Sequence, residues 1–155
     1  MKSRLTKKFV TVFIVTLIMT GIASIISGCT LTANTSTPDQ VSIDVSYDDF
    51  IGNNHVTMEA EVTVGDTLVV TLFSNPTTGF QWSESAQISD QTILKQAEHK
   101  FEEPQAKGIV GAGGKEVWTF TALKKGTTEI TMEYSRPWEG GEKGEWTFKL
   151  TATVK

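Results

Sequence analysis

Asn75-Pro76-Thr77-Thr78-Gly79-Phe80 is a turn sequence set between two strand-like runs, residues 67–73 before it and the run that carries Trp82 after it. Pro76 fixes its own φ and favours extended backbone at Asn75, while Gly79 can take the positive φ of a chain reversal. The turn is therefore expected to be stiff. A plain hairpin needs only Asn-Gly or Asp-Gly, so the turn itself does not require two threonines at its tip. Stiff loops on rigid scaffolds often carry function.

From residue 41 onward the chain shows short strand-like runs separated by turn signals. Apolar and polar side chains alternate in residues 41–46 and 116–123, and most regularly in residues 145–154. Further strands are expected at residues 55–64, 67–73, 79–85, 93–101 and 130–134, with a loop at 47–54. Leu94 and Ala97 would also suit a helix. Seven or eight short strands with such spacing predict an all-β fold, an immunoglobulin-like antiparallel β-sandwich.

Three connections are expected at one end of this sandwich, because successive antiparallel strands reverse the direction of the chain. If residues 67–73 form strand B, these are the B–C, D–E and F–G loops. The D–E loop contains Gly111-Ala112-Gly113-Gly114, which has little side chain to pack and lets another surface approach the backbone; a plain flexible loop is the alternative.

The F–G loop begins with Arg136-Pro137-Trp138. Arg and Trp are the residue types that dominate binding energy at protein interfaces when they are central and desolvated. Two other interpretations stay open for this segment. Trp138 could fold back into the core, or stack on Arg136 within the molecule.

Taken together, the three segments resemble the signature loops of chagasin-type inhibitors of papain-like cysteine proteases, and the resemblance covers residues 41–155. It implies a sandwich whose three loops block the protease active-site cleft reversibly, competitively and without a covalent bond. Thr77 and Thr78 would sit nearest the catalytic centre of the protease. Gly111, Ala112, Gly113 and Gly114 would lie along one wall of the cleft, and Arg136, Pro137 and Trp138 along the other.

The residues of the chain suit a binding protein better than an enzyme. His55 and His99 are the two histidines, and neither lies near a motif that would complete a metal site or a nucleophile–histidine pair. Both are expected on strand surfaces, and no metal or cofactor is expected. The alternative function is an extracellular carbohydrate- or protein-binding module. Sugar binders usually offer several stacking rings, whereas Trp82, Trp118 and Trp146 fall on core-facing positions of the expected strands.

The N-terminal residues read as a secretion signal with a lipid attachment site. Residues 1–8 are basic, and residues 9–26 carry no charge. Ile26-Ser27-Gly28-Cys29 then resembles a bacterial-type lipobox, and Cys29 is the single cysteine of the chain. We therefore expect a lipoprotein-type signal peptide at 1–28, lipidation of Cys29 and an extracytoplasmic domain held at the membrane. An uncleaved membrane helix is the alternative, since 18 apolar residues are just long enough to span a bilayer.

Cleavage after residue 28 would change the charge of the protein. The four basic residues of the signal are lost with no acid, which leaves 10 Lys+Arg against 18 Asp+Glu, a net charge of −8 with His neutral. Such an acidic surface disfavours nucleic acid as a partner. Residues 29–40 are rich in Thr, Ser, Asn and Pro and are expected to be a flexible tether to the inhibitor domain at 41–155, which we expect to be a monomer.

Overall fold

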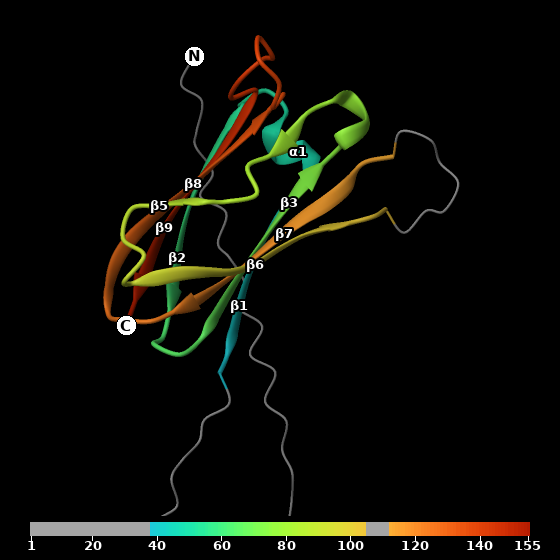
Figure 1. Ribbon diagram of the computed structural model, residues 1–155. Helices are drawn as coiled ribbons and strands as arrows, with labels where there is room; N and C mark the ends of the chain where they lie inside the picture. Colours follow the sequence, from blue (N-terminus) through green and yellow to red (C-terminus); the bar gives the residue numbers. More distant parts are fainter. Residues whose placement is uncertain (1–37, 105–111) are drawn as a thin grey trace, which may run out of the picture. The chain divides into compact units, whose positions relative to one another are not determined.

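The computed structural model describes residues 38–104 and 112–155 of the protein. Its strands, shown in Figure 1, are β1 (Gln40–Val45), β2 (His55–Val62), β3 (Thr67–Ser74), β4 (Gln81–Trp82), β5 (Gln87–Ile88), β6 (Leu94–Glu102), β7 (Gly114–Ala122), β8 (Gly126–Ser135) and β9 (Trp146–Val154). Two short helical turns, α1 (Tyr47–Phe50) and the 3-10 turn η1 (Pro76–Thr78), complete the described elements. The expected signal peptide, Cys29, most of the tether and Gly111 lie outside the described residues.

The strands form two sheets, ordered β1-β3-β7-β6 and β2-β9-β8-β4, with β5 also paired to β8. This confirms the expected immunoglobulin-like β-sandwich. The described strands number nine, because a two-residue strand that the sequence did not predict, β5, is present as well. The expectation of antiparallel pairing throughout is wrong at two edges, because β1–β3 and β2–β9 are parallel. β1 and β3 run the same way because β2, between them in sequence, crosses to the other sheet.

The core consists of the inward-facing side chains of both sheets. On β3 the buried positions are every second residue from Leu68 to Ser74, and on β9 they run from Phe148 to Val154. This period of two is the sequence signal of a half-buried strand. Trp82 and Trp118 are fully buried and Trp146 is partly buried, as their positions in the strand patterns predicted.

Residues 47–54, expected as a loop, contain the helix α1. Ser46 donates both its backbone N–H and its hydroxyl to Asp49 Oδ2, at 3.0 and 2.7 Å. An acidic side chain that reaches back to the residue before the first turn is the pattern of a capping box. The helix also buries Phe50, whose ring stacks on Trp146 at a centroid distance of 4.9 Å. Capping and burial together stabilise a helix too short to form alone.

The two histidines differ in their surroundings. His55 is exposed, as expected, with Nδ1 2.7 Å from Thr147 Oγ1. His99 is less exposed than expected, because its side chain is only 18% exposed, its ring stacks on Trp118 and Nε2 lies 2.9 Å from Glu116 Oε2. Alternation along β6 could not show this, because Glu116 lies on the neighbouring strand β7.

No helix in residues 38–104 and 112–155 is long and apolar enough to cross a bilayer.

The fold predicts that α1 is attached to the core mainly through Phe50. Phe50→Ala should lower the free energy of unfolding by about 3–5 kcal/mol, because it removes a fully buried ring and leaves a cavity. Urea denaturation followed by tryptophan fluorescence would measure this loss. Ile51→Ala is the matched control, since Ile51 is 60% exposed and its loss should change stability by about 0.5 kcal/mol or less. Equal effects of the two variants would contradict the role of Phe50.

Candidate functional site

Strand register places the described residues of the three predicted segments at the same end of the sandwich. Ser74, the last residue of β3, pairs with Gly114, the first residue of β7. In the other sheet Gln81 pairs with Ser135, and Tyr134 pairs with Trp146. We call the turn at residues 75–80 the threonine turn and residues 111–114 the glycine segment. The threonine turn therefore leaves one sheet beside Gly114 of the glycine segment and enters the other sheet beside the β8–β9 connection. In Figure 1 the turn η1 and the β8–β9 connection (red) both lie at the upper end.

Hydrogen bonds within the threonine turn hold its shape. Asn75 Oδ1 accepts from the Thr77 hydroxyl at 2.6 Å and from the Thr77 N–H at 3.3 Å. The Thr78 hydroxyl donates to the Asn75 carbonyl at 2.7 Å, and Gly79 N–H donates to the Pro76 carbonyl at 2.9 Å. The threonine pair thus has a structural role that the sequence did not reveal, because both hydroxyls are used inside the turn. Pro76, Thr77 and Thr78 remain exposed at the tip.

Trp138 links the β8–β9 connection to the threonine turn. Its indole lies against Gly79, so close that a Cβ on Gly79 would meet Trp138 Cη2 at 2.7 Å. Gly79 has φ of +82°, which also favours glycine. Trp138 nevertheless stays 51% exposed, so it is not folded back into the core. The Cη2 edge of the ring contacts the turn, and about half of the side chain stays accessible to a partner.

Arg136 stacks between aromatic rings of the same two loops. Its guanidinium carbon lies 4.4 Å from the centre of the Phe80 ring and 5.9 Å from that of Trp138. Stacked guanidinium–ring pairs of this kind are attractive, more so when shielded from water. The Phe80 ring in turn stacks on Tyr134 at 5.5 Å. The Arg136–Trp138 contact that the sequence left open is therefore present, and Phe80 takes the closer position.

Lys143 links two backbone carbonyls within the β8–β9 connection. Its ammonium donates to the backbone carbonyls of Arg136 and Trp138. Gly144 N–H donates to the Ser135 hydroxyl at 2.8 Å, and Arg136 N–H donates to the Glu142 carbonyl at 2.8 Å. A loop cross-linked in this way loses little conformational freedom on binding.

The described part of the glycine segment is shaped by packing inside the domain. A Cβ on Gly113 would meet the Phe73 ring at 2.3 Å, and one on Gly114 would meet the Glu102 carbonyl at 2.4 Å. The close approach inferred from these glycines is therefore at least partly to the protein's own side chains. Ala112 and Gly113 stay partly exposed beside the threonine turn.

A fourth connection, predicted as a loop but not assigned to this end of the sandwich, lies at the same end. Val45 of β1 pairs with Leu72 of β3, so α1 follows β1 at the loop end. The Tyr47 ring packs on Phe73 at 5.1 Å and stays 48% exposed. A serine followed three residues later by an acid was the one signal in the sequence for this turn.

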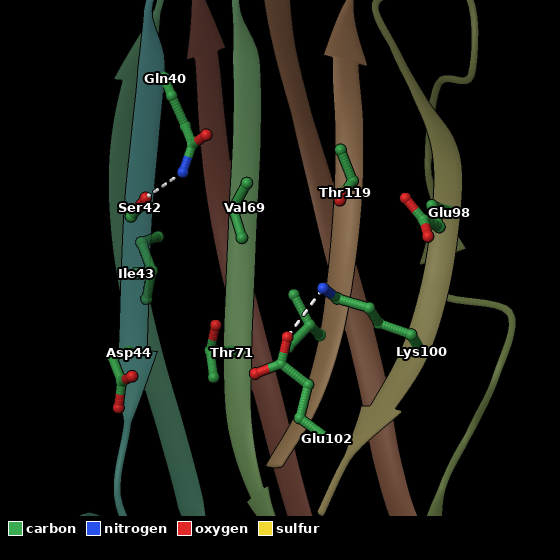
Figure 2. A pocket seen from close by; sticks show the side chains of 11 residues that line it. Gln40, Ser42, Ile43, Asp44, Val69, Thr71, Glu98, Lys100, Glu102 and Thr119 are labelled. Atoms are coloured by element: carbon green, nitrogen blue, oxygen red, sulfur yellow. Dashed lines mark hydrogen bonds and ion pairs between the residues drawn. The ribbon is translucent and has the colours of Figure 1, made fainter.

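The face of the β1-β3-β7-β6 sheet carries a shallow hollow of about 380 Å³, shown in Figure 2. Its lining is polar and aliphatic, with Lys100 paired to Glu102 at 2.7 Å. That hydrogen bond, with the charge of Glu102, raises the pKa of Lys100 above its usual value. None of the lining residues is aromatic, so this hollow offers no ring on which a sugar could stack. It gives no support to a carbohydrate-binding module.

The fold and the site define a class of protein: a β-sandwich whose loops at one end are held by hydrogen bonds and stacking and together form a binding surface. The sequence profile of the family described as "Chagasin family peptidase inhibitor I42" matches residues 61–152. Chagasin from Trypanosoma cruzi is 37% identical over 81 residues, which are 51% of this chain and 73% of chagasin. Amoebiasin-2 from Entamoeba histolytica is 32% identical over 95 residues, 58% of this chain and 70% of that protein. The chain belongs to the chagasin family of peptidase inhibitors, which are not enzymes themselves.

Solved structures agree in fold. The cysteine protease inhibitor EhICP2 from Entamoeba histolytica matches with a TM-score of 0.59 at 22% identity, covering 77% of this chain and 100% of that one. PbICP-C, solved in complex with falcipain-2, matches with a TM-score of 0.54 at 17% identity, covering 76% of this chain and 99% of that one.

The packing of Trp138 on Gly79 leads to a prediction about binding. Gly79→Ala should lower the free energy of unfolding by roughly 1–2 kcal/mol, because alanine disfavours positive φ, and should also displace the Trp138 indole. Inhibition of papain should therefore weaken. Gly65→Ala is the control, because Gly65 has φ of +95° with nothing within 4 Å of an added Cβ. It should lose similar stability without losing inhibition. Unchanged inhibition by Gly79→Ala would show that the indole position is unimportant.

Proposed function

We propose that this protein is a reversible, non-covalent, competitive inhibitor of papain-like cysteine proteases that occludes the active-site cleft with three loops of one pole. Membership of a peptidase-inhibitor family supports inhibition itself. The observation that carries the mode of inhibition is the interlocking of two loops far apart in sequence, with Trp138 on Gly79 and Arg136 on Phe80. These contacts make one continuous surface from two separate connections.

The tip of the threonine turn is proposed to enter the cleft. Pro76, Thr77 and Thr78 are exposed, while the turn around them is closed by its own hydrogen bonds. A turn held in this way would be bound without presenting a peptide carbonyl in attack geometry, and cleavage requires that geometry. Residues 111–114 would then lie along one wall of the cleft and residues 136–138 along the other.

Rigidity would favour tight binding through a surface of ordinary size. Association costs translational and rotational freedom, and ordering a mobile loop would add to that cost. Here Pro76 and Pro137 restrict the backbone, and Lys143 donates hydrogen bonds to two carbonyls of the β8–β9 connection. We propose that the protein acts as a monomer that forms a one-to-one complex with its target.

The proposed location is the outer face of the cell membrane. Residues 1–28 would be removed as a signal peptide, Cys29 would carry the lipid, and residues 29–40 would tether the inhibitor domain at 41–155. The basic start, the uncharged run and the single cysteine at its end support this proposal. More than one acyl chain is needed for stable anchoring.

The test of inhibition is occupancy of the protease cleft. The protein without residues 1–29 should raise the apparent KM of papain without changing kcat, and should protect the catalytic cysteine of papain from alkylation by iodoacetamide. Trp138→Ala should raise the inhibition constant about 30-fold or more, as loss of a central interface tryptophan does. Steady-state kinetics and mass spectrometry of the alkylated protease would measure both effects.

Leu123→Ala is the matched control for the tryptophan variant. Leu123 is 46% exposed and follows β7 at the far end of the sandwich, so inhibition should be unchanged. Full alkylation of papain in the presence of micromolar protein would overturn the proposed function. Equal inhibition by Trp138→Ala and Leu123→Ala would overturn the assignment of the binding pole.

Lipidation predicts a shift in location that depends on one side chain. In a bacterial host, the full chain should incorporate labelled palmitate and sediment with membranes, because the acyl chains insert into the bilayer. Cys29→Ser should abolish the label, since it removes the proposed attachment atom. Thr30→Ser is the control and should keep the label. A labelled Cys29→Ser protein would contradict the proposed site, whereas an unlabelled parent that stays with membranes would favour an uncleaved helix.

A further inference from the structure

A buried carboxyl group lies directly beneath the threonine turn. Within residues 38–104 and 112–155, three polar or charged side chains are buried: Ser74 (0% exposed), Glu116 (4%) and Thr128 (1%). Two of the three, Ser74 and Glu116, are hydrogen-bonded to each other at 2.7 Å. Burying a carboxylate is unfavourable unless its oxygens are paired. Core packing alone therefore does not explain why a glutamate lies at position 116.

The two oxygens of Glu116 face different elements. Oε1 accepts from the Ser74 hydroxyl at 2.7 Å and from the Trp82 backbone N–H at 3.3 Å. Oε2 lies 2.9 Å from His99 Nε2, and the His99 ring is itself stacked on Trp118 at 4.7 Å. One side chain on β7 therefore connects β3, β4 and β6.

These partners stand on either side of the threonine turn. Ser74 is the residue before Asn75, and Trp82 is the second residue after Phe80. β3 and β4 belong to different sheets, so no ladder of backbone hydrogen bonds joins them. β4 is the last strand in the order β2-β9-β8-β4, so no other described strand accepts a hydrogen bond from its outer side. Glu116 supplies that acceptor for the Trp82 N–H.

We propose that Glu116 is a positioning residue that sets the spacing between the two ends of the threonine turn, acting through Ser74 and Trp82. His99 holds the second oxygen and so fixes the orientation of the carboxyl group. The inference rests on the proposed function, because it assigns Glu116 a part in the affinity of the inhibitor. An apolar side chain at position 116 would fill the core but leave two buried donors without an acceptor.

The test compares variants that keep or remove the acceptor. Glu116→Leu removes it, and Ser74→Ala removes one donor in case the leucine variant does not fold. Each should raise the inhibition constant for papain by about tenfold or more, since each removes the Ser74–Glu116 hydrogen bond that holds one end of the turn. The double variant should lose no more than Glu116→Leu alone, because both substitutions break one contact. Glu116→Gln keeps an acceptor oxygen and should stay within about threefold of the parent.

Two measurements separate positioning from stability. Thr128→Val is the matched control, because Thr128 is equally buried and bonds to Ser89 and Asp90 near the other end of β8. It should lower the urea midpoint and leave inhibition unchanged. The second measurement is amide hydrogen exchange in the free protein. Thr78 and Gly79, whose N–H groups are bonded inside the turn, should exchange faster in Ser74→Ala and Glu116→Leu but not in Thr128→Val.

Each outcome decides the proposal. Faster exchange in the turn together with weaker inhibition supports it. Unchanged exchange at Thr78 and Gly79, or variants that lose stability yet inhibit like the parent, would overturn it. If the parent does not inhibit papain, the proposed function fails, and hydrogen exchange alone still decides whether Glu116 positions the turn.

Discussion

The threonine turn must carry the chain from one sheet to the other in six residues, and the rest of the binding pole depends on how its two ends are held. Ser74 ends β3 in one sheet, and Gln81 begins β4 in the other. No backbone ladder can join strands of different sheets, so side chains have to make the connection. Trp82 Nε1 donates to the Phe73 carbonyl at 2.8 Å, the Tyr134 hydroxyl accepts from Asn75 N–H at 2.9 Å, and Glu116 lies between the two ends.

Above this base, aromatic and guanidinium stacking joins two loops into one surface. Arg136 covers Phe80, Trp138 covers Gly79, and the Phe80 ring rests on Tyr134. The family is one of peptidase inhibitors, and under the proposed function this surface acts by binding alone. Its physical requirement is a shape that already exists before the partner arrives, because every degree of freedom lost on association reduces affinity.

Much of this protein could be predicted from its sequence, although several details could not. Strand alternation in residues 146–154 and the turn residues between runs indicated the sandwich, since the period of two is a local property. The three loop motifs indicated the inhibitor family, which the family profile then confirmed. The parallel edge pairings and the contacts of His99 with Trp118 and Glu116 were not predicted, because both depend on which strand becomes a neighbour.

By itself the sequence determined which residues are stiff, which are small and which are apolar: Pro76, Gly79 and the alternating faces of the strands follow from side-chain chemistry alone. Only the tertiary structure decided what those properties serve. In the sequence, Glu116 is an ordinary acidic residue at the start of a predicted strand. It becomes a buried acceptor for Ser74 and Trp82 only when β3, β4 and β6 surround it. Contacts between residues distant along the chain carry no local signal, because they arise from packing the two sheets together.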